Sequence, residues 1–190
     1  MFFEKDVKEM KEIIVLLLMV MFLTGCTGME IGWFDLNNFV LPDDDEFLSS
    51  IKWLDSVLWI AWYMQSNFSY QYCVYAKSPY QLWKTKIGDC NDFSLFGAVA
   101  GAYNGLNTWQ IRITFDDSNI SHWLAIYKAE NEDFYSYTTN QYYGGSFQSE
   151  EDFEAFEVIV NSYCSSRKRK WISYRVYNCN GDIIKEEVQH

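Results

Sequence analysis

The chain has 190 residues, enough for one globular domain once an N-terminal export segment is set aside. Hydrophobic residues make up 49% of it and aromatic residues 19%, which excludes global disorder because so much apolar surface can form a packed core. The formal net charge of −11 excludes nucleic acid as a partner, since phosphate recognition needs a basic surface.

The first predicted element is an export signal. Residues 13–23 form an unbroken apolar run, too short for a permanent membrane span but typical of a signal-peptide core. The run ends in Leu-Thr-Gly-Cys26, which resembles a bacterial lipobox, where small residues precede a lipidated cysteine. Residues 1–25 are therefore predicted to be a lipoprotein signal peptide. The mixed charges ahead of the run are unusual for such a signal, and a start at Met10 would be more ordinary; the alternative is a plain buried helix.

The predicted anchor is followed by a tether and a helix. Residues 26–45 are expected to form the tether, whose last carboxylates suit the N-terminus of a helix. A buried helix is predicted over residues 46–66, because apolar residues recur there at spacings of three and four. Its buried face would contain Phe47, Ile51, Leu54, Leu58 and Ala61. Residues 46–190 are expected to form one domain.

A second helix is expected at the centre of that domain. It follows a loop containing Ser78-Pro79, begins at Asp89 or Cys90 and ends at Asn104-Gly105, where glycine supplies the usual left-handed stop. Its middle is apolar on nearly every side and rich in small residues. A helix without a polar face must be covered all round.

The rest of the chain predicts a sheet interrupted by one helix. Strands are expected over residues 108–115, 122–127 and 134–139, as an antiparallel meander. A helix capped by residues 149–152 follows, and residues 171–179 then pair with 183–188 through Asn-Gly. Helices come first and strands later, so the predicted class is α+β. The apolar face of the last helix would contain Phe153, Phe156, Val160 and Tyr163, and the basic residues 167–170 are expected to be a solvated loop.

Cys90 and His122 are the candidate catalytic residues. A cysteine in the first turn of a helix lies where the helix dipole and unpaired N–H groups favour a thiolate and could stabilise an oxyanion. His122 is the candidate base by elimination, because the other histidine, His190, is the last residue. Judged from the residues alone, such a pair could equally be two ordinary core residues.

The segments around these two residues resemble the transglutaminase-like superfamily. Residues 83–95, with Gly-Asp-Cys90 at the helix start, resemble its nucleophile segment, and residues 122–127 resemble its histidine strand. The resemblance implies a papain-like fold, in which the core helix carrying Cys90 packs on an antiparallel sheet carrying His122. NlpC/P60 peptidases share this order, but their nucleophile segment usually reads Asp-Cys-Ser-Gly, where this chain has Asp-Cys-Asn-Asp.

The family usually orients its histidine with an aspartate near the end of the next strand, and this chain has none there. Asn140 is the expected substitute, because its amide oxygen can accept a hydrogen bond from the imidazole, although it could equally serve the following turn. Thr139 is the alternative if the strand register differs by one residue, and Asp133 lies too early. Trp83 and Trp123 could wall a substrate groove or belong to the core.

The resemblance implies an envelope-anchored cysteine hydrolase or acyltransferase that acts on peptide or amide bonds through a Cys90 acyl-enzyme. Its expected partners are a peptide or peptidoglycan-like substrate and a membrane, reached through a lipid on Cys26 on the outer side of the cytoplasmic membrane or in the outer membrane. No cofactor or metal is expected, since no zinc-binding spacing is present. Cys164 and Cys179 could form a disulfide or remain free thiols. The alternatives are a non-catalytic peptide- or glycan-binding module on the same fold and a structural lipoprotein.

Overall fold

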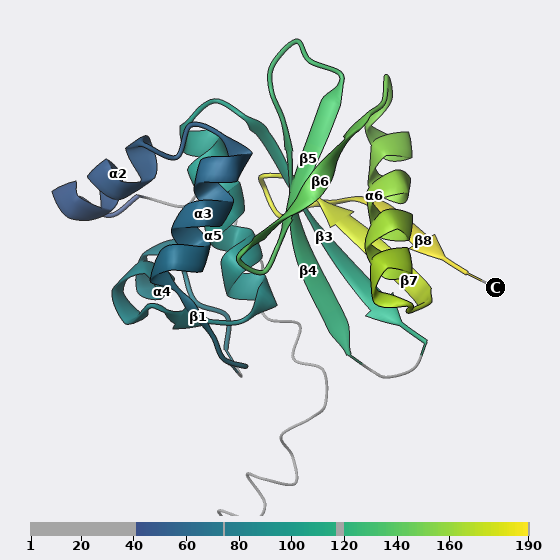
Figure 1. The fold of residues 1–190 in the computed structure, drawn as a ribbon, viewed down its shortest axis with the longest axis horizontal. Coiled ribbons are helices and arrows are strands. Elements are labelled where there is room, and N and C mark those ends of the chain that lie inside the picture. The colour runs from purple at the N-terminus through teal and green to yellow at the C-terminus, as the bar shows by residue number, and fades with distance from the viewer. Residues whose placement is uncertain (1–40, 74, 117–119, 190) are drawn as a thin grey trace, which may run out of the picture. The chain divides into compact units, whose positions relative to one another are not determined.

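The computed structural model describes residues 41–73, 75–116 and 120–189 of the chain (Figure 1). The predicted signal peptide, the predicted lipidation site Cys26 and most of the predicted tether lie outside the described residues. No helix in the described part of the chain is both long enough and apolar enough to cross a membrane.

The main sheet has six strands, all antiparallel to their neighbours, in the order β6-β5-β4-β3-β7-β8. Helices α3 and α5 lie on one side of it and helix α6 on the other (Figure 1). The predicted α+β class and the packing of the Cys90 helix on the His122 sheet are confirmed. The strands are β3 (Asn107–Phe115), β4 (Ser121–Lys128), β5 (Phe134–Thr139), β6 (Tyr142–Gln148), β7 (Trp171–Tyr177) and β8 (Ile183–Val188), and a separate parallel pair is formed by β1 (Ser69–Tyr70) and β2 (Ile87–Gly88).

The single helix predicted over residues 46–66 is wrong, because two helices occupy this segment, α2 (Asp45–Lys52) and α3 (Val57–Asn67). Ser56 starts the second helix, since its hydroxyl accepts a backbone N–H from the first turn of α3 at 3.3 Å. The break changes which side chains α3 buries. Leu58, predicted to be buried, is 63% exposed, whereas Ile60, Ala61 and Met64 are buried.

Helix α4 (Pro79–Thr85) lies where the sequence predicted only a loop. It begins with a capping box: the Ser78 hydroxyl accepts the N–H of Gln81 at 3.1 Å, and the Gln81 side chain accepts the N–H of Ser78 at 2.9 Å. Pro79 suits the first helical position, because it lacks an N–H that would have no partner there. This start signal is legible in the sequence, so the helix could have been predicted.

Helix α5 (Cys90–Tyr103) is the central helix that the sequence predicted, and its residues 92–101 are all buried. Two glycines let it approach Tyr127 of β4 closely. A Cβ atom at Gly97 would lie 2.2 Å from the Tyr127 hydroxyl oxygen, and one at Gly101 would lie 2.9 Å from the same ring. The close contact fixes how α5 lies on the sheet and therefore where Cys90 meets it.

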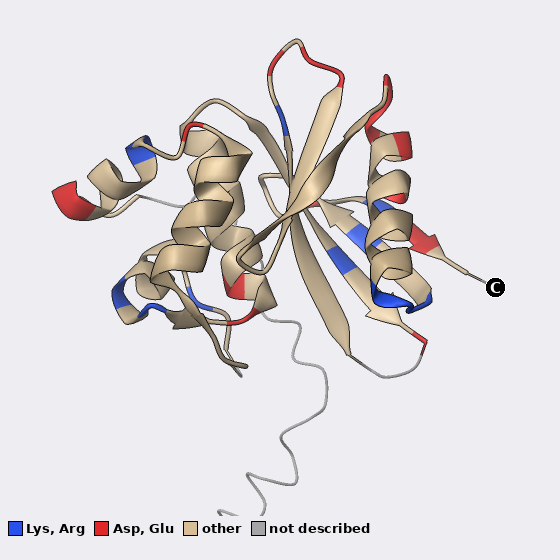
Figure 2. Cartoon of the chain, in the orientation of Figure 1, with Lys and Arg blue, Asp and Glu red and all other residues tan. Residues whose placement is uncertain are grey.

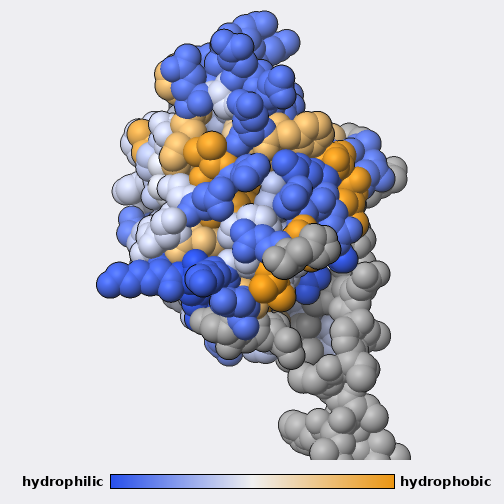
Figure 3. All heavy atoms as spheres, turned by 90° about the vertical axis from the view of Figure 1, so that its right-hand side faces the viewer, coloured by the Kyte–Doolittle hydropathy of each residue, from blue (hydrophilic) through white to orange (hydrophobic). Residues whose placement is uncertain are grey.

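Helix α6 (Asp152–Arg167) connects β6, at one edge of the sheet, to β7, which pairs with β3. Its start differs from the prediction, because Ser149 bonds to the backbone of Glu151 and no side chain caps the helix. Phe153, predicted to be on the buried face, is 48% exposed, whereas Phe156, Val160 and Tyr163 are buried. Figure 3 shows that hydrophilic side chains cover most of the face on this side of the molecule.

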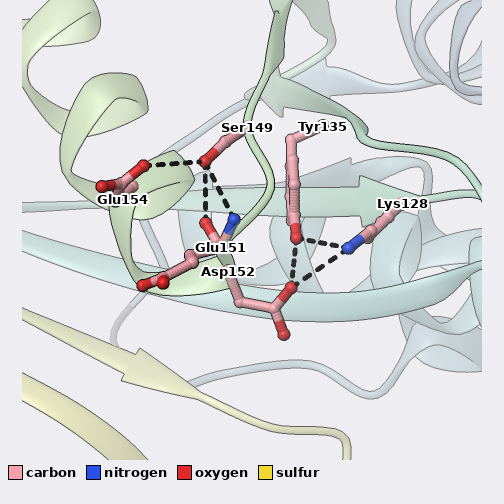
Figure 4. Close-up of polar contacts among 6 residues, drawn as sticks. All are labelled: Lys128, Tyr135, Ser149, Glu151, Asp152 and Glu154. Carbon is pink, nitrogen blue, oxygen red and sulfur yellow. Dashed lines mark hydrogen bonds and ion pairs between the residues drawn. The ribbon is translucent and has the colours of Figure 1, made fainter.

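A polar cluster joins the first residue of α6 to the sheet (Figure 4). The Nζ atom of Lys128 on β4 donates to the hydroxyl of Tyr135 on β5 at 2.6 Å and lies 3.3 Å from the Asp152 carboxylate. The Tyr135 hydroxyl also donates to Asp152. Asp152 thus ties the start of α6 to two strands.

Strand β6 occupies part of the segment that was predicted to be a turn, residues 140–145. Gly144 lies against the ring of Tyr137 on β5, and a Cβ atom there would be 2.0 Å from a ring carbon. A glycine at this position allows the strand to pack closely on an aromatic ring.

Buried apolar side chains form one cluster on each face of the sheet. The cluster on the α6 face includes Leu124, Ile126, Tyr135, Tyr137, Phe156 and Tyr163. The cluster on the α5 face includes Phe47, Ile60, Met64, Phe93, Phe96, Ala125 and Tyr127. Successive residues of β4 thus point alternately into the two clusters.

Candidate active site

Cys90 is the first residue of α5, as predicted, and two carboxylates hold the backbone around it. The Asp89 side chain accepts the N–H groups of Asn91 at 3.0 Å and of Asp92 at 3.4 Å. The Asp92 side chain accepts the N–H of Asp89 at 3.1 Å, which completes a capping box.

The same two carboxylates hold the loop that precedes α4. Asp89 accepts the N–H of Cys73 at 3.2 Å, and Asp92 accepts the N–H of Lys77 at 2.6 Å. Asp92 is completely buried, so burial raises its pKa, while the two N–H groups lower it. Both residues are positioning residues for the start of α5.

The thiol of Cys90 is protonated at neutral pH. Burial and then the nearby Asp89 carboxylate raise the pKa of Cys90 to about 11, against the opposing effect of backbone N–H groups of Trp123, Asn91 and Cys90 itself. The expectation that the helix start lowers this pKa is therefore wrong. Loss of water around the sulfur outweighs the N–H groups that point at it.

The sulfur reaches the sheet at the point where β5 ends. The last pair between β4 and β5 joins Leu124 to Thr139, so Trp123 lies beyond the end of β5. The backbone N–H of Trp123 is one of those that hydrogen-bond the Cys90 sulfur. Cys90 therefore lies against the peptide group that links His122 to Trp123.

The imidazole of His122 is held by two residues. Its Nε2 atom is 2.9 Å from the hydroxyl oxygen of Thr139, and its ring stacks on Tyr163 of α6 with centroids 4.9 Å apart and an angle of 7°. Burial, with Arg167 and Arg169 nearby, lowers the pKa of His122 to about 4. The ring is therefore neutral at pH 7. In the tautomer that donates from Nε2 to Thr139, the lone pair is on Nδ1, which has no hydrogen bond within the described residues.

Asn140, predicted to orient His122, does not contact it, and the alternative residue Thr139 takes that place. The register explains the correction: Leu124 pairs with Thr139, so Thr139 shares the face of Leu124 and His122. Asn140 lies in the turn after β5 with φ of 50°, and its buried Oδ1 atom has no partner within the described residues.

The ring of His122 packs on Tyr163 of α6, on the face of the sheet opposite to α5. Sulfur and imidazole approach the end of β5 from opposite faces of the sheet. No hydrogen bond joins them within the part of the chain that the structure describes. At rest, the pair consists of a neutral thiol and a neutral imidazole.

Two tyrosines complete the surroundings, and the sequence did not single out either for this site. Burial raises the pKa of Tyr163, a hydrogen bond with Thr139 lowers it, and the Cys90 thiolate would be near enough to raise it. Burial also raises the pKa of Tyr70, followed by the charges of Cys90 and Asp89. The sequence carries no local signal for these positions, because both come from elements far from the nucleophile segment.

The remaining candidates have other surroundings. The ring of Trp83 lies in the helical core, with its centroid 5.6 Å from that of Phe47 and 6.0 Å from that of Tyr80. The main chain of Trp123 lies next to Cys90, whereas its ring packs on Tyr177 with ring centroids 5.4 Å apart. The thiols of Cys73, Cys164 and Cys179 are free, like that of Cys90, so the disulfide alternative is not formed. Within the described residues, no group of three or more His, Cys, Asp or Glu could hold a metal ion.

Comparison with known proteins gives structural similarity alone. No protein-family model matches the chain, and no curated protein matches it. Three solved structures of LapG from Legionella pneumophila are similar to it. One covers 72% of this chain and 76% of its own, with 13% identity and a TM-score of 0.46. The match to EGTA-treated LapG covers 70% of this chain and 72% of the LapG chain, with 12% identity and a TM-score of 0.44. The match to calcium-bound LapG covers 68% of this chain and 70% of the LapG chain, with 15% identity and a TM-score of 0.41.

Proposed function

We propose that this protein is a cysteine hydrolase or acyltransferase acting on peptide or amide bonds, with Cys90 as nucleophile and His122 as base. One observation carries the proposal. At the end of β5, the Cys90 sulfur lies against the peptide group beside His122, whose ring is held by Thr139. The resemblance of both segments to the transglutaminase-like superfamily supports the same assignment and a papain-like fold.

The chemistry needs the imidazole to move from its stacked position on Tyr163 toward the sulfur. His122 Nδ1 would take the thiol proton as the sulfur attacks the substrate carbonyl. The N–H groups of Trp123 and Asn91, whose hydrogen bonding lowers the pKa of Cys90, would then stabilise the oxyanion. The imidazolium then protonates the leaving amine, which leaves an acyl group on Cys90. Water or a second amine releases that group after losing a proton to the neutral ring.

The two pKa shifts favour general-base catalysis over a resting ion pair. The ring is already a free base above a pKa of about 4, and the thiol keeps its proton up to about 11. Proton transfer would thus accompany attack, as for a serine nucleophile. The rate of acylation should therefore change little with pH between these two values.

Acetylation by p-nitrophenyl acetate tests this mechanism. Mass spectrometry would locate the acetyl group, and release of p-nitrophenol would give the rate between about pH 5 and pH 9. We expect acetylation at Cys90 with a nearly flat profile. In His122→Gln, the rate should follow thiolate formation and rise about tenfold per pH unit. Cys179, whose thiol donates to the side chain of Asn180 between β7 and β8, is the internal reference.

Identical pH profiles for the wild type and His122→Gln would overturn the proposal, as would acetylation that avoids Cys90. That outcome would favour a non-catalytic peptide- or glycan-binding module. The specific observation behind this second candidate is that the ring of His122 packs on Tyr163 and makes no hydrogen bond to the sulfur.

We also propose that the domain is held at the cell envelope by a lipid on Cys26, as the lipobox-like segment suggests. Cys26→Ser, or inhibition of lipoprotein processing, should leave the chain unlipidated and at precursor mass. Detection of intact Met1 or Met10 on mature protein from untreated cells would contradict the anchor.

A further inference from the structure

A basic cleft lies on the α5 face of the sheet. Cross-strand pairing places Arg112 of β3 beside Arg175 of β7 and Thr114 beside Ser173. These four side chains line a cavity of about 210 Å³, large enough for a group of several heavy atoms. Figure 2 shows basic positions on β3 and β7 in a chain that is otherwise strongly acidic.

The cleft has one buried hydrogen-bond donor that has no partner within the described residues, the Nε atom of Arg112. Arg175 bonds Glu186 through Nε at 2.7 Å, so one carboxylate stands against two guanidinium groups. A buried donor without a partner is costly, and an anion would satisfy it.

The cleft lies level with Cys90. Ser94 of α5 accepts a hydrogen bond from the Gln110 side chain at 2.7 Å, and Gly101 lies near Thr108, so α5 runs opposite to β3. Moving four residues back from Ser94 reaches Cys90, a rise of about 6 Å. Moving two residues on from Gln110, along the same face, reaches Arg112, about 6.8 Å away.

Trp123 connects the two places. It pairs with Arg112 across the strands, and its backbone N–H bonds the Cys90 sulfur. Its ring contacts Tyr177, whose pKa is raised by burial and lowered by the nearby charge of Arg175. A substrate lying over Trp123 would therefore reach both the thiol and the two arginines.

We propose that the cleft of Arg112, Thr114, Ser173 and Arg175 binds a carboxylate of the substrate acted on by Cys90. The inference rests on the proposed function and adds the substrate class: a peptide with a carboxylate close to the bond that is attacked. Two arginine forks and two hydroxyl groups match the planar, multiply accepting shape of a carboxylate. A long polyanion does not fit a chain of net charge −11.

Matched alkylating probes test this inference. The N-iodoacetyl derivatives of glutamate α-amide and of glutamine α-amide differ in one carboxylate. The rate of modification at Cys90, followed on the Cys90 peptide by mass spectrometry, gives an anionic-to-neutral ratio. The same ratio on glutathione corrects for intrinsic reactivity. We expect the corrected ratio to favour the anionic probe roughly fivefold at low salt, and less at high salt.

Charge variants set the direction of the effect. Arg112→Gln and Arg175→Gln should lower the ratio toward one, and Glu186→Gln should raise it. Lys52→Gln, which removes an exposed positive charge from α2, should leave it unchanged. Using a ratio removes changes in the pKa of Cys90, which affect both probes alike.

The outcomes separate this inference from the proposed function. Equal ratios in the wild type and the three cleft variants would overturn the carboxylate site, whatever the reactivity of Cys90. If His122→Gln left the pH profile of acetylation unchanged, the catalytic proposal would be overturned. The anionic-to-neutral ratio would still test the carboxylate site by itself. Inorganic phosphate should slow only the anionic probe. Binding of phosphate at Arg112 without any preference of Cys90 for the anionic probe would identify a phosphate site and overturn the substrate assignment.

Discussion

Burial makes the His122 ring a weak base, and its hydrogen-bond partner Thr139 is uncharged. A hydroxyl can hold the ring in place, but it carries no charge to stabilise an imidazolium, whereas burial and two arginines oppose protonation. Hydrogen bonding orients the ring and burial sets its charge. The aspartate of a catalytic triad both orients the histidine and stabilises its charged form. Thr139 can only orient the ring.

Thr139→Asp should raise the pKa of His122 well above its value of about 4, because a carboxylate next to Nε2 favours the charged ring. NMR titration of the ring resonances would measure the change. Thr139→Asn has a similar shape without the charge and should leave the pKa low. A pKa in Thr139→Asp no higher than in Thr139→Asn would contradict this account.

The same burial should make the fold sensitive to acid. The folded-state pKa of His122, about 4, is lower than the usual histidine value of 6.5, so the unfolded chain binds more protons between these values. Stability from this source is present above about pH 6.5 and is lost as the pH falls toward 4. The loss is on the order of 3 kcal/mol.

Urea unfolding at several pH values would measure that loss. His122→Gln cannot titrate and should show a shallower decline in stability between about pH 6.5 and pH 4. Parallel curves for the variant and the wild type would show that other groups cause the acid sensitivity.

Among the elements, the start of α5 depends on Asp89 in two ways that can be separated by mutation. Asp89 caps the helix through its oxygen atoms and raises the pKa of Cys90 through its charge. Asp89→Asn should keep an oxygen for the cap and lower the pKa of Cys90. Asp89→Ala should lower that pKa too, but should also cost about 1 kcal/mol of stability, because the helix loses its cap.

The pH dependence of iodoacetamide labelling at Cys90 would report the pKa, and urea unfolding would report the stability. If Asp89→Asn labelled like the wild type, the high pKa of Cys90 would come from burial alone. Asp92→Asn is less suitable for the comparison, because Asp92 is completely buried and accepts two backbone N–H groups.

For the molecule as a whole, α5 packs tightly against the sheet where it crosses Tyr127. Gly97→Ala would place a methyl group 2.2 Å from the Tyr127 hydroxyl oxygen, so we expect a loss of about 2 kcal/mol. Adding Tyr127→Phe should recover part of this loss, because the nearest ring carbon is 3.5 Å away, an ordinary contact. Tyr127→Phe alone should cost about 1 kcal/mol, since Thr138 loses its hydrogen bond.

Gly101→Ala provides the matched control. Its methyl group would meet ring carbons of Tyr127 at 2.9 and 3.0 Å, which removal of the hydroxyl does not change. Tyr127→Phe should therefore fail to rescue Gly101→Ala. Unfolding of the single and double variants in urea gives the coupling energies. Equal rescue at both glycines would contradict the packing described here.

Local signals in the sequence were sufficient for several elements. The Gly-Asp-Cys90 segment marks the start of α5, because capping needs only a few consecutive residues. Strand β3 follows from alternation, polar turns delimit β4 and β5, and the helix α4 was legible in the capping box of Ser78 and Gln81. The break at Ser56 was harder to see, because apolar residues continue through it and hide the second helix start.

The sequence by itself thus determined the α+β class, the central helix with Cys90 at its start and the acidic character of the chain. Only the tertiary structure decided that Thr139, and not Asn140, holds His122, that the ring packs on α6, and that Arg112 lies beside Arg175. Helix caps and periodicity act over a few neighbouring residues, so one stretch of sequence reveals them. Strand register, the choice of face and burial depend on residues far apart in the chain, and a shift of one residue exchanges the side chains that meet.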